Sequence, residues 1–225
     1  MANPIQILST KILSPLHKQE LMKYGIELIE ADFIKTEIKS FELKDLNESL
    51  IFTSQNAVHS ILSDPKSEEL LPKLREKNVY CVGLKTKTLL SDNGFNVVAY
   101  TGYASDLAEI ITLIYANESY TFFSGNLRRD TLPDALKEAG IKFNEIQVYE
   151  TALQPQKIKA NPEALLFFSP SGVNSYLKDN TIQKQICFCI GDTTAEALSK
   201  ITKNIIIADQ PTIEDVIEDV IQEYK

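Results

Sequence analysis

Short apolar runs alternate along the chain with longer segments whose apolar residues recur at helical spacing. In one example, the run 166–168 passes through the turn 169–172 into a segment that carries Val173, Tyr176 and Leu177 on one face. Each such stretch predicts a strand, a turn and a helix. Because strands that alternate with helices form parallel sheets covered on both faces, the pattern predicts an α/β protein with doubly wound sheets.

The chain repeats this plan, because its two halves align at a constant offset of 115 residues. The pairs matched at this offset include Ser9 with Ser124, Gly25 with Gly140, and Ser54 with Ser169. Beyond a short deletion the offset becomes 108, and it pairs Gly83 with Gly191. One register held across a strand, a turn and a helix indicates an internal duplication, so we expect two similar parallel-sheet domains.

Two segments at equivalent positions, residues 33–38 and 148–153, mix apolar with charged residues and look like exposed linker strands. If both connect the same two domains, they pair as a two-stranded antiparallel linker, and the N-terminal strand and helix join the C-terminal part of the chain. We then expect a discontinuous domain of residues 1–33 and 154–225, a second domain of residues 39–147, and linker strands 34–38 and 148–153. The plainer alternative assigns one domain to each half, with a boundary near residues 116–119.

Composition excludes several classes of protein. Hydrophobic residues make up 44% of the 225 residues, which is enough for folded cores. The longest apolar runs fall far short of the roughly 20 residues that cross a bilayer, and the first residues lack the basic leader and apolar region of a secretory signal. We therefore expect a cytoplasmic protein with no membrane contact. The net charge of −8 disfavours a nucleic-acid partner.

Cysteine and histidine usage predicts no metal centre. Cys81, Cys187 and Cys189 all lie in apolar segments, where a free thiol behaves as a small hydrophobe. His17 and His59 are the only histidines, and neither stands at a spacing from a cysteine that would close a zinc site. The chain also lacks the glycine-rich dinucleotide and Walker motifs, so we expect no nucleotide cofactor.

Four turns after predicted strands carry hydroxyls or glycine where helices are expected to begin: 53–56, 124–126, 169–172 and 191–194. A helix N-terminus offers unpaired N–H groups and a partial positive charge, so it binds carboxylate or phosphate. For any single turn, ordinary N-capping is the commoner explanation. The number of turns favours ligand binding, because the carboxyl ends of strands in an open parallel sheet point into one crevice.

Charged and aromatic side chains near these turns add candidate chemistry. Arg128 and Arg129 can bind a carboxylate in bidentate fashion, although solvation or a salt bridge to Asp130 explains them as well. Lys85 adds positive charge after Gly83. Tyr149, in the second linker segment, could donate a proton to a departing oxygen, but a half-buried strand aromatic is the commoner role.

Several strings of this sequence resemble the uroporphyrinogen-III synthase family, and the resemblance runs nearly from end to end. The strings are Ile-Phe-Thr-Ser-Gln-Asn-Ala-Val from residue 51, Tyr-Cys-Val-Gly-Leu-Lys-Thr from 80, Ser-Gly-Asn-Leu-Arg-Arg-Asp-Thr-Leu-Pro from 124, Val-Tyr-Glu-Thr from 148, Phe-Phe-Ser-Pro-Ser-Gly-Val from 167, Ile-Gly-Asp-Thr-Thr-Ala from 190 and Pro-Thr from 211. Lys11 is a departure, because many members carry arginine there. The resemblance implies two α/β domains joined by a two-stranded ladder, and cyclisation of the linear tetrapyrrole hydroxymethylbilane to uroporphyrinogen III without a cofactor.

The resemblance also implies roles for individual residues. Tyr149 is expected to hydrogen-bond the leaving hydroxyl as the catalytic residue. The substrate's eight carboxylates are expected to be bound by donors from both domains: Ser54, Gln55, Asn56, Lys85, Ser124, Gly125, Asn126, Arg129, Ser169, Ser171, Gly172, Thr193 and Thr194. We expect a monomer that can contact hydroxymethylbilane synthase transiently. A non-enzymatic two-lobed anion sensor is the main alternative function, and it predicts the same crevice.

Overall fold

The computed structural model describes residues 4–225, which form two compact units. Unit 1 contains the described residues up to Lys35 together with Ala152–Lys225, and unit 2 contains Thr36–Thr151. Both unit limits fall inside the segments expected to be linkers. The chain therefore enters unit 2 once and leaves it once.

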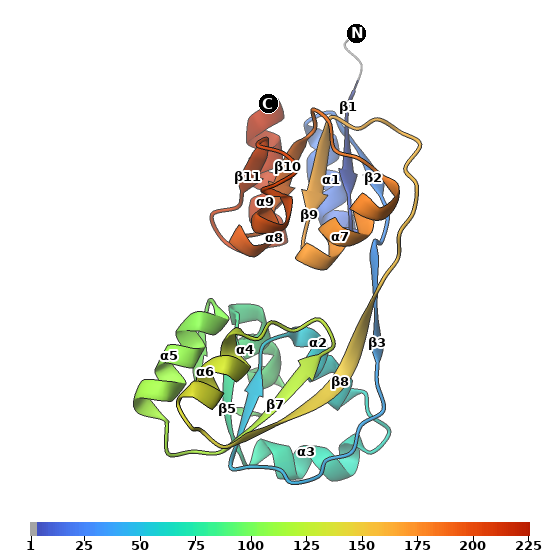
Figure 1. The fold of residues 1–225 in the computed structure, drawn as a ribbon. Coiled ribbons are helices and arrows are strands. Elements are labelled where there is room, and N and C mark those ends of the chain that lie inside the picture. Colours follow the sequence, from blue (N-terminus) through green and yellow to red (C-terminus); the bar gives the residue numbers. More distant parts are fainter. Residues whose placement is uncertain (1–3) are drawn as a thin grey trace. The chain divides into compact units, whose positions relative to one another are not determined.

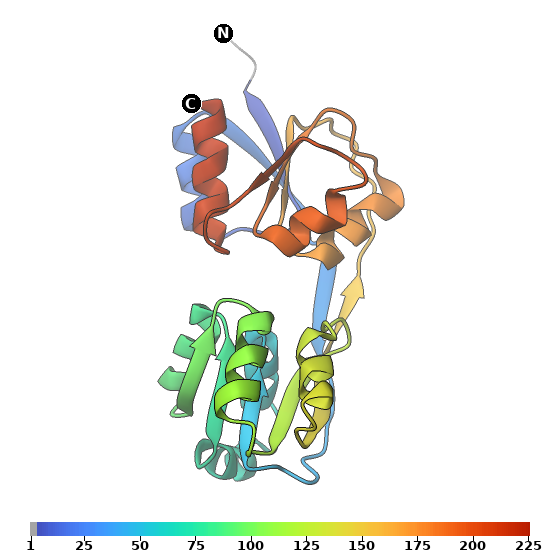
Figure 2. The ribbon, with the colours of Figure 1, turned by 60° about the vertical axis from the view of Figure 1, so that its left-hand side comes forward.

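Unit 1 is a five-stranded parallel sheet in the order β11-β10-β9-β1-β2. Its strands are β1 (Ile5–Ser9), β2 (Ile26–Glu30), β9 (Ala164–Phe167), β10 (Ile186–Cys189) and β11 (Ile205–Ile207). Its helices are α1 (Pro15–Lys23), α7 (Pro170–Asp179), α8 (Asp192–Leu198) and α9 (Ile213–Tyr224). Helices α1 and α9 cover one face of the sheet, and α7 and α8 cover the other (Figure 2).

Unit 2 is a six-stranded sheet in the order β3-β8-β7-β4-β5-β6 (Figure 1). Its strands are β3 (Ile34–Ile38), β4 (Ser49–Phe52), β5 (Asn78–Val82), β6 (Asn96–Thr101), β7 (Tyr120–Gly125) and β8 (Phe143–Leu153). Its helices are α2 (Gln55–Leu62), α3 (Ser67–Arg75), α4 (Leu84–Asp92), α5 (Ala104–Ile114) and α6 (Thr131–Glu138). Helices α2, α3 and α4 pack on one face, and α5 and α6 pack on the other.

The duplication is visible in the strand order. Strands β6-β5-β4-β7-β8 of unit 2 occupy the same sequence of positions as β11-β10-β9-β1-β2 of unit 1. Every pair within these two five-strand sets is parallel. The predicted α/β class with two similar parallel sheets is confirmed.

Each sheet is sandwiched because its central strands are apolar on both faces. In β4, Ile51 packs with the α5 and α6 layer, whereas Phe52 packs with α2, α3 and α4. Both side chains are fully buried. Burial of each such side chain contributes about 1.5–3 kcal/mol, so the strands provide a rigid frame for the loops at their ends.

The linker differs from the expectation in length. Strand β8 is one continuous strand from Phe143, and its first half pairs in parallel with β7. Its end pairs with β3, where Gln154 N–H donates to the Phe33 carbonyl and Lys39 N–H to the Val148 carbonyl. Residue 154 thus pairs with residue 33 and residue 148 with residue 39. The residue number falls along one segment as it rises along the other, so β3 and β8 are antiparallel. Whether the ladder acts as a hinge stays a prediction.

Candidate functional site

The predicted ligand-binding residues lie at the carboxyl ends of parallel strands in each unit. In unit 1 they follow β9 and β10, and in unit 2 they follow β4 and β5 or lie at and just after the end of β7. Because the strands concerned are parallel within each sheet, their loops meet at one edge of that sheet. Each unit thus presents one cluster of hydroxyl, amide and backbone N–H groups.

In unit 1 the cluster is built around the start of α7. Ser169 caps this helix, since its Oγ accepts the Gly172 N–H at 3.1 Å and lies 3.0 Å from the Ser171 Oγ. A Cβ at Gly172 would lie 3.4 Å from the Ser169 Oγ and 3.6 Å from the Thr10 Oγ1. These are ordinary van der Waals distances, so Gly172 lies beside both hydroxyls without any close approach that requires glycine.

Thr10 is a member of this cluster that the sequence analysis missed. Its N–H and its Oγ1 both donate to the Leu166 carbonyl, at 3.1 and 2.7 Å, so the end of β1 is fastened to β9. The repeat offset carried the signal, because Thr10 stands where unit 2 has Gly125.

The start of α8 contributes the other predicted donors of unit 1. Gly191 precedes the helix in extended conformation, and the Thr194 and Ala195 N–H groups donate to its carbonyl. Thr193 is half-buried, whereas Thr194 is 1% exposed. The two threonines therefore differ in access, and Thr193 presents more surface to a ligand.

In unit 2 the start of α2 repeats the arrangement at α7. Ser54 caps the helix by accepting the Asn56 N–H at 3.1 Å, and Gln55 and Asn56 are exposed. Helix α4 begins after Gly83, whose φ of 89° lies in the left-handed region that favours glycine. Lys85 lies in the first turn of α4 and is exposed.

The loop after β7 departs from the prediction. Strand β7 continues through Gly125, and the next helix begins only at Thr131, so no helix starts at residues 124–126 as expected. The strand continues because it is paired with β8 up to Gly125. The Ser124 hydroxyl is buried and donates to the Glu145 Oε1 at 2.5 Å, so it is engaged within the unit.

The two arginines of this loop have different surroundings. Arg128 binds Glu145 in bidentate fashion, with Nε–Oε1 at 2.7 Å and Nη2–Oε2 at 2.9 Å, and also pairs with Asp130. Burial raises the pKa of Glu145, but the bonds from Arg128 and Ser124 outweigh this effect and hold the pKa below its usual value. Arg129 is exposed and has no ion pair within residues 4–225.

Tyr149 lies in β8 opposite Gly125 and is half-buried. Its ring packs against the cluster of α2, α3 and α4, and its hydroxyl makes no hydrogen bond to another described residue. The buried tyrosines of the unit differ, because Tyr80 donates to Glu118 and Tyr120 donates to the Tyr115 carbonyl. The Tyr149 hydroxyl is therefore not committed to any other described residue.

The loop between β1 and α1 has its backbone donors occupied. Ile12 N–H donates to the Asp32 carboxylate at 3.0 Å, and Leu13 N–H donates to the Glu30 Oε1 at 2.6 Å. Lys18 pairs with the same Glu30 at 2.5 Å. These amides are not open to an anionic ligand while the carboxylates hold them.

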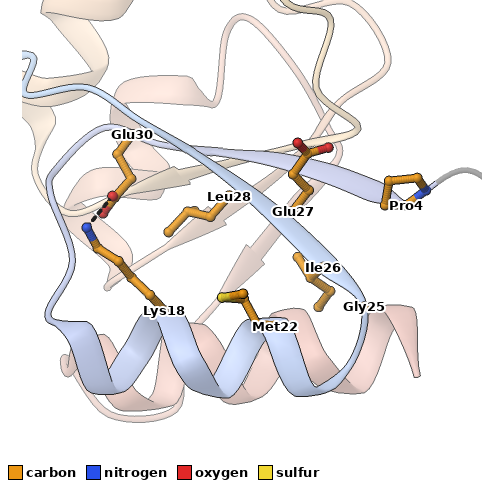
Figure 3. A pocket seen from close by; sticks show the side chains of 8 residues that line it. All are labelled: Pro4, Lys18, Met22, Gly25, Ile26, Glu27, Leu28 and Glu30. Atoms are coloured by element: carbon orange, nitrogen blue, oxygen red, sulfur yellow. Dashed lines mark ion pairs between the residues drawn. The ribbon is translucent and has the colours of Figure 1, made fainter.

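A pocket of about 470 Å³ lies along the free edge of β2 and contains none of the predicted residues (Figure 3). Met22, Ile26 and Leu28 give it an apolar floor, and the Lys18–Glu30 pair stands at one end.

Within the part of the chain that the structure describes, no three His, Cys, Asp or Glu side chains come together to hold a metal. The three cysteines are buried and unbridged as predicted, and burial raises the pKa of each thiol to about 12.

A family model described as "Uroporphyrinogen-III synthase HemD" matches residues 17–218 and so spans both units. The chain belongs to the uroporphyrinogen-III synthase family. The family match confirms the resemblance that the sequence strings suggested. No helix among the described residues is long and apolar enough to span a membrane.

Individual members of the uroporphyrinogen-III synthase family agree with this assignment. The chain is 26% identical over 205 residues to a uroporphyrinogen-III synthase of Chlorobaculum parvum, covering 81% of this chain and 82% of that protein. It is 22% identical to a "Porphyrin biosynthesis protein HemD" of Ruminiclostridium josui over 77% of this chain, but covers only 37% of that longer protein.

Solved structures in the family share the fold. A uroporphyrinogen-III synthetase of Helicobacter pylori superposes with a TM-score of 0.74 at 23% identity, covering 97% of this chain and 99% of that one. A mutant uroporphyrinogen III synthase of Thermus thermophilus gives 0.72 at 13% identity, with 98% of both chains covered.

Proposed function

We propose that this chain is a uroporphyrinogen-III synthase, a lyase that cyclises hydroxymethylbilane with loss of water and inversion of ring D. The observation that carries the proposal is the family match over residues 17–218, which includes the donor loops of both units. A cytoplasmic location and a monomeric state belong to the same proposal. So does a transient contact with hydroxymethylbilane synthase, because the substrate is unstable.

Neutral donors are suited to this substrate. The chain carries a net charge of −8, so a substrate with eight carboxylates is repelled at long range and must be held by short-range contacts. The capped helix starts at Ser54 and Ser169 offer backbone N–H groups and a partial positive charge for such contacts. Gln55 and Thr193 add neutral side-chain donors, and Arg129, which has no ion pair among residues 4–225, adds a charged one.

The chemistry needs orientation more than strong acid catalysis. The C–O bond of the hydroxymethyl group breaks, the hydroxyl leaves with one proton as water, and the pyrrole nitrogen stabilises the resulting azafulvenium. Without the enzyme, closure occurs at the nearer unsubstituted carbon and gives the symmetric type I isomer. Holding the chain bent, so that the substituted carbon of ring D attacks and forms a spiro intermediate, favours type III through proximity and electrostatic stabilisation.

Tyr149 takes the role of hydrogen-bond donor to the departing hydroxyl in this proposal. Its hydroxyl is uncommitted within the described chain and lies at the carboxyl end of β7, among the donor loops of unit 2. Because the pyrrole drives ionisation, we expect its contribution to be roughly ten-fold in rate, below the range typical of general acids.

Isomer analysis tests the function directly. The protein is incubated with hydroxymethylbilane, and the oxidised uroporphyrins are separated by chromatography. Type III product with the native protein, against type I with a heat-denatured control, is the expected result. Type I in both samples would refute the synthase and leave a binding module. Tyr149→Phe is assayed beside them, and unchanged turnover and isomer ratio would remove Tyr149 from the mechanism.

A further inference from the structure

Strands β7 and β8 shift register where Tyr149 enters the sheet. Ser124 lies opposite Gln147, but Gly125 lies opposite Tyr149, so Val148 is the extra residue of a bulge. Successive strand residues normally point to opposite faces. Here Val148 and Tyr149 both pack against the cluster formed by α2, α3 and α4. The bulge thus redirects the tyrosine ring, as bulges near functional sites often do.

Gly125 provides the space into which the ring is redirected. A Cβ at this position would lie 2.3 Å from both Cε2 and Cζ of Tyr149 and 2.8 Å from its hydroxyl oxygen. The backbone at Gly125 is not in the left-handed region, unlike that at Gly83 or Gly140, so its conformation would accept any residue. The ring, and not the backbone, requires glycine at this position.

The residue after Gly125 fastens the strand on the far side of the tyrosine. The Asn126 Oδ1 accepts the Thr151 N–H at 2.8 Å, and the Asn126 Nδ2 donates to the Thr151 carbonyl at 3.2 Å. On the near side, the Gln147 Nε2 donates to the Tyr149 carbonyl at 3.3 Å. The side chain of Asn126 is therefore committed to the backbone of β8.

The internal repeat provides a comparison for this arrangement. At the offset of 115 residues, Gly125 corresponds to Thr10, Asn126 to Lys11, and Tyr149 to Ile34. Unit 1 thus has a side chain where unit 2 has none, and the residue aligned with Tyr149 is not aromatic, although Phe33 N–H donates to the Thr10 carbonyl at 3.3 Å. Among the glycines of the described residues, Gly125 is the one whose Cβ would meet a tyrosine ring, although both units share the strand order.

We infer that Gly125 and Asn126 are positioning residues, which hold the Tyr149 ring against the end of β7 and act on the reaction through it. This inference rests on the proposed function and refines it, since both residues were expected to contact substrate carboxylates. Gly125 supplies the space for the ring, and Asn126 fixes the strand beyond it. The hydroxyl of Tyr149 is thereby kept in one place at the carboxyl edge of the sheet.

The test combines kinetics with a probe of the ring itself. We expect Gly125→Ala to lower kcat by up to about ten-fold, the contribution assigned to Tyr149, while KM changes less than about two-fold, because the ring is displaced and the carboxylate contacts remain. In protein labelled with 3-fluorotyrosine, the ¹⁹F resonance that disappears in Tyr149→Phe should shift in Gly125→Ala. Gly102→Ala is the matched control, because Gly102 is exposed in the same unit and its Cβ would meet nothing within 4 Å.

A double-mutant cycle keeps the inference testable if one variant is unstable. Gly125→Ala should lower the Tm in the native background but not in Tyr149→Ala, where the ring is gone. Asn126→Ala should shift the same ¹⁹F resonance. A rise in KM alone, an unmoved resonance or additive effects in the cycle would overturn the inference. These readouts are separate from the function, because the resonance and the Tm remain measurable even if the protein makes no type III isomer.

Discussion

The loops after β1 and β7 are equivalent in the repeat, yet they use their polar groups differently. In unit 1 the carboxylates of Glu30 and Asp32 accept the backbone N–H groups of the loop. In unit 2, Glu145, which is the repeat counterpart of Glu30, accepts side-chain donors from Arg128 and Ser124. Both glutamates restrain a loop, but the unit 2 loop also packs at Gly125 against Tyr149, whose hydroxyl has no hydrogen-bond partner among the described residues.

The two duplicated units therefore share their strand order but not the residues of the loop after β1 or β7. The strand order and the capped helices at Ser54 and Ser169 recur. The residues at the first strand end diverge from Thr10 and Ile34 to Gly125 and Tyr149. We therefore expect carboxylate binding to draw on both units, whereas assistance to the leaving group comes from unit 2.

The largest effect is expected from removing the matched core phenylalanines. Phe52 stacks on Phe123 with ring centroids 5.0 Å apart, and its repeat counterpart Phe167 contacts Tyr176 at 5.6 Å. Both are fully buried. Phe52→Ala and Phe167→Ala should each cost about 3–5 kcal/mol of stability, measured by urea unfolding.

Hydrogen exchange then tests whether the two units unfold separately. Each core cluster contains residues of one unit only. Phe52→Ala should speed amide exchange within residues 36–151, and Phe167→Ala within the rest of the chain. Equal acceleration throughout the chain in either variant would show that the units do not unfold separately.

The ion pairs of Glu145 and Glu30 should differ by a smaller amount in their contribution to stability. Arg128→Ala removes the bidentate partner of Glu145 and should cost about 2 kcal/mol, because a charge-assisted pair at a half-buried site is lost. Lys18→Ala is the matched variant of unit 1 and should cost less than about 1 kcal/mol, since Glu30 keeps its bond from Leu13. Urea midpoints at neutral pH compare the two, and equal losses would contradict the distinction.

The contribution of Arg128 should also depend on pH in a fixed direction. The pKa of Glu145 is lowered in the folded protein, so the stabilisation is fully present above the unfolded pKa, close to the ordinary value of 4.5. It should be lost as the pH falls through the lower folded value. The midpoint difference between the native protein and Glu145→Gln should therefore shrink below about pH 4.5. A difference that grows on acidification would mean that the pKa is raised.

The smallest effect concerns the three cysteines, which lie in β5 of unit 2 and in β10 of unit 1. Burial raises the pKa of Cys81, Cys187 and Cys189 to about 12, so thiolate is scarce near neutral pH. A thiol reagent at pH 8 should label almost none of the three in the native protein and all of them in urea. Rapid labelling of one native thiol would show that its strand opens.

Much of the frame followed from the sequence, because strand, turn and helix each have a local signal. Ser54 and Ser169 were predicted at helix starts, and both cap helices. The loop after Ser124 was mispredicted, because a serine and a glycine are typical of a helix start, and the partner that keeps β7 extended lies in β8. The close approach of Tyr149 to Gly125 depends on a register shift between strands, which local patterns do not encode.

The claim that donors of both units bind one substrate is tested most directly by paired loop variants. Ser54→Ala with Gln55→Ala alters unit 2, and Ser169→Ala with Ser171→Ala alters unit 1. Steady-state KM and the type III to type I ratio are measured for each pair against the native protein. We expect both pairs to raise KM and the share of type I product. One pair that leaves both quantities unchanged, while the other is impaired, would contradict the account.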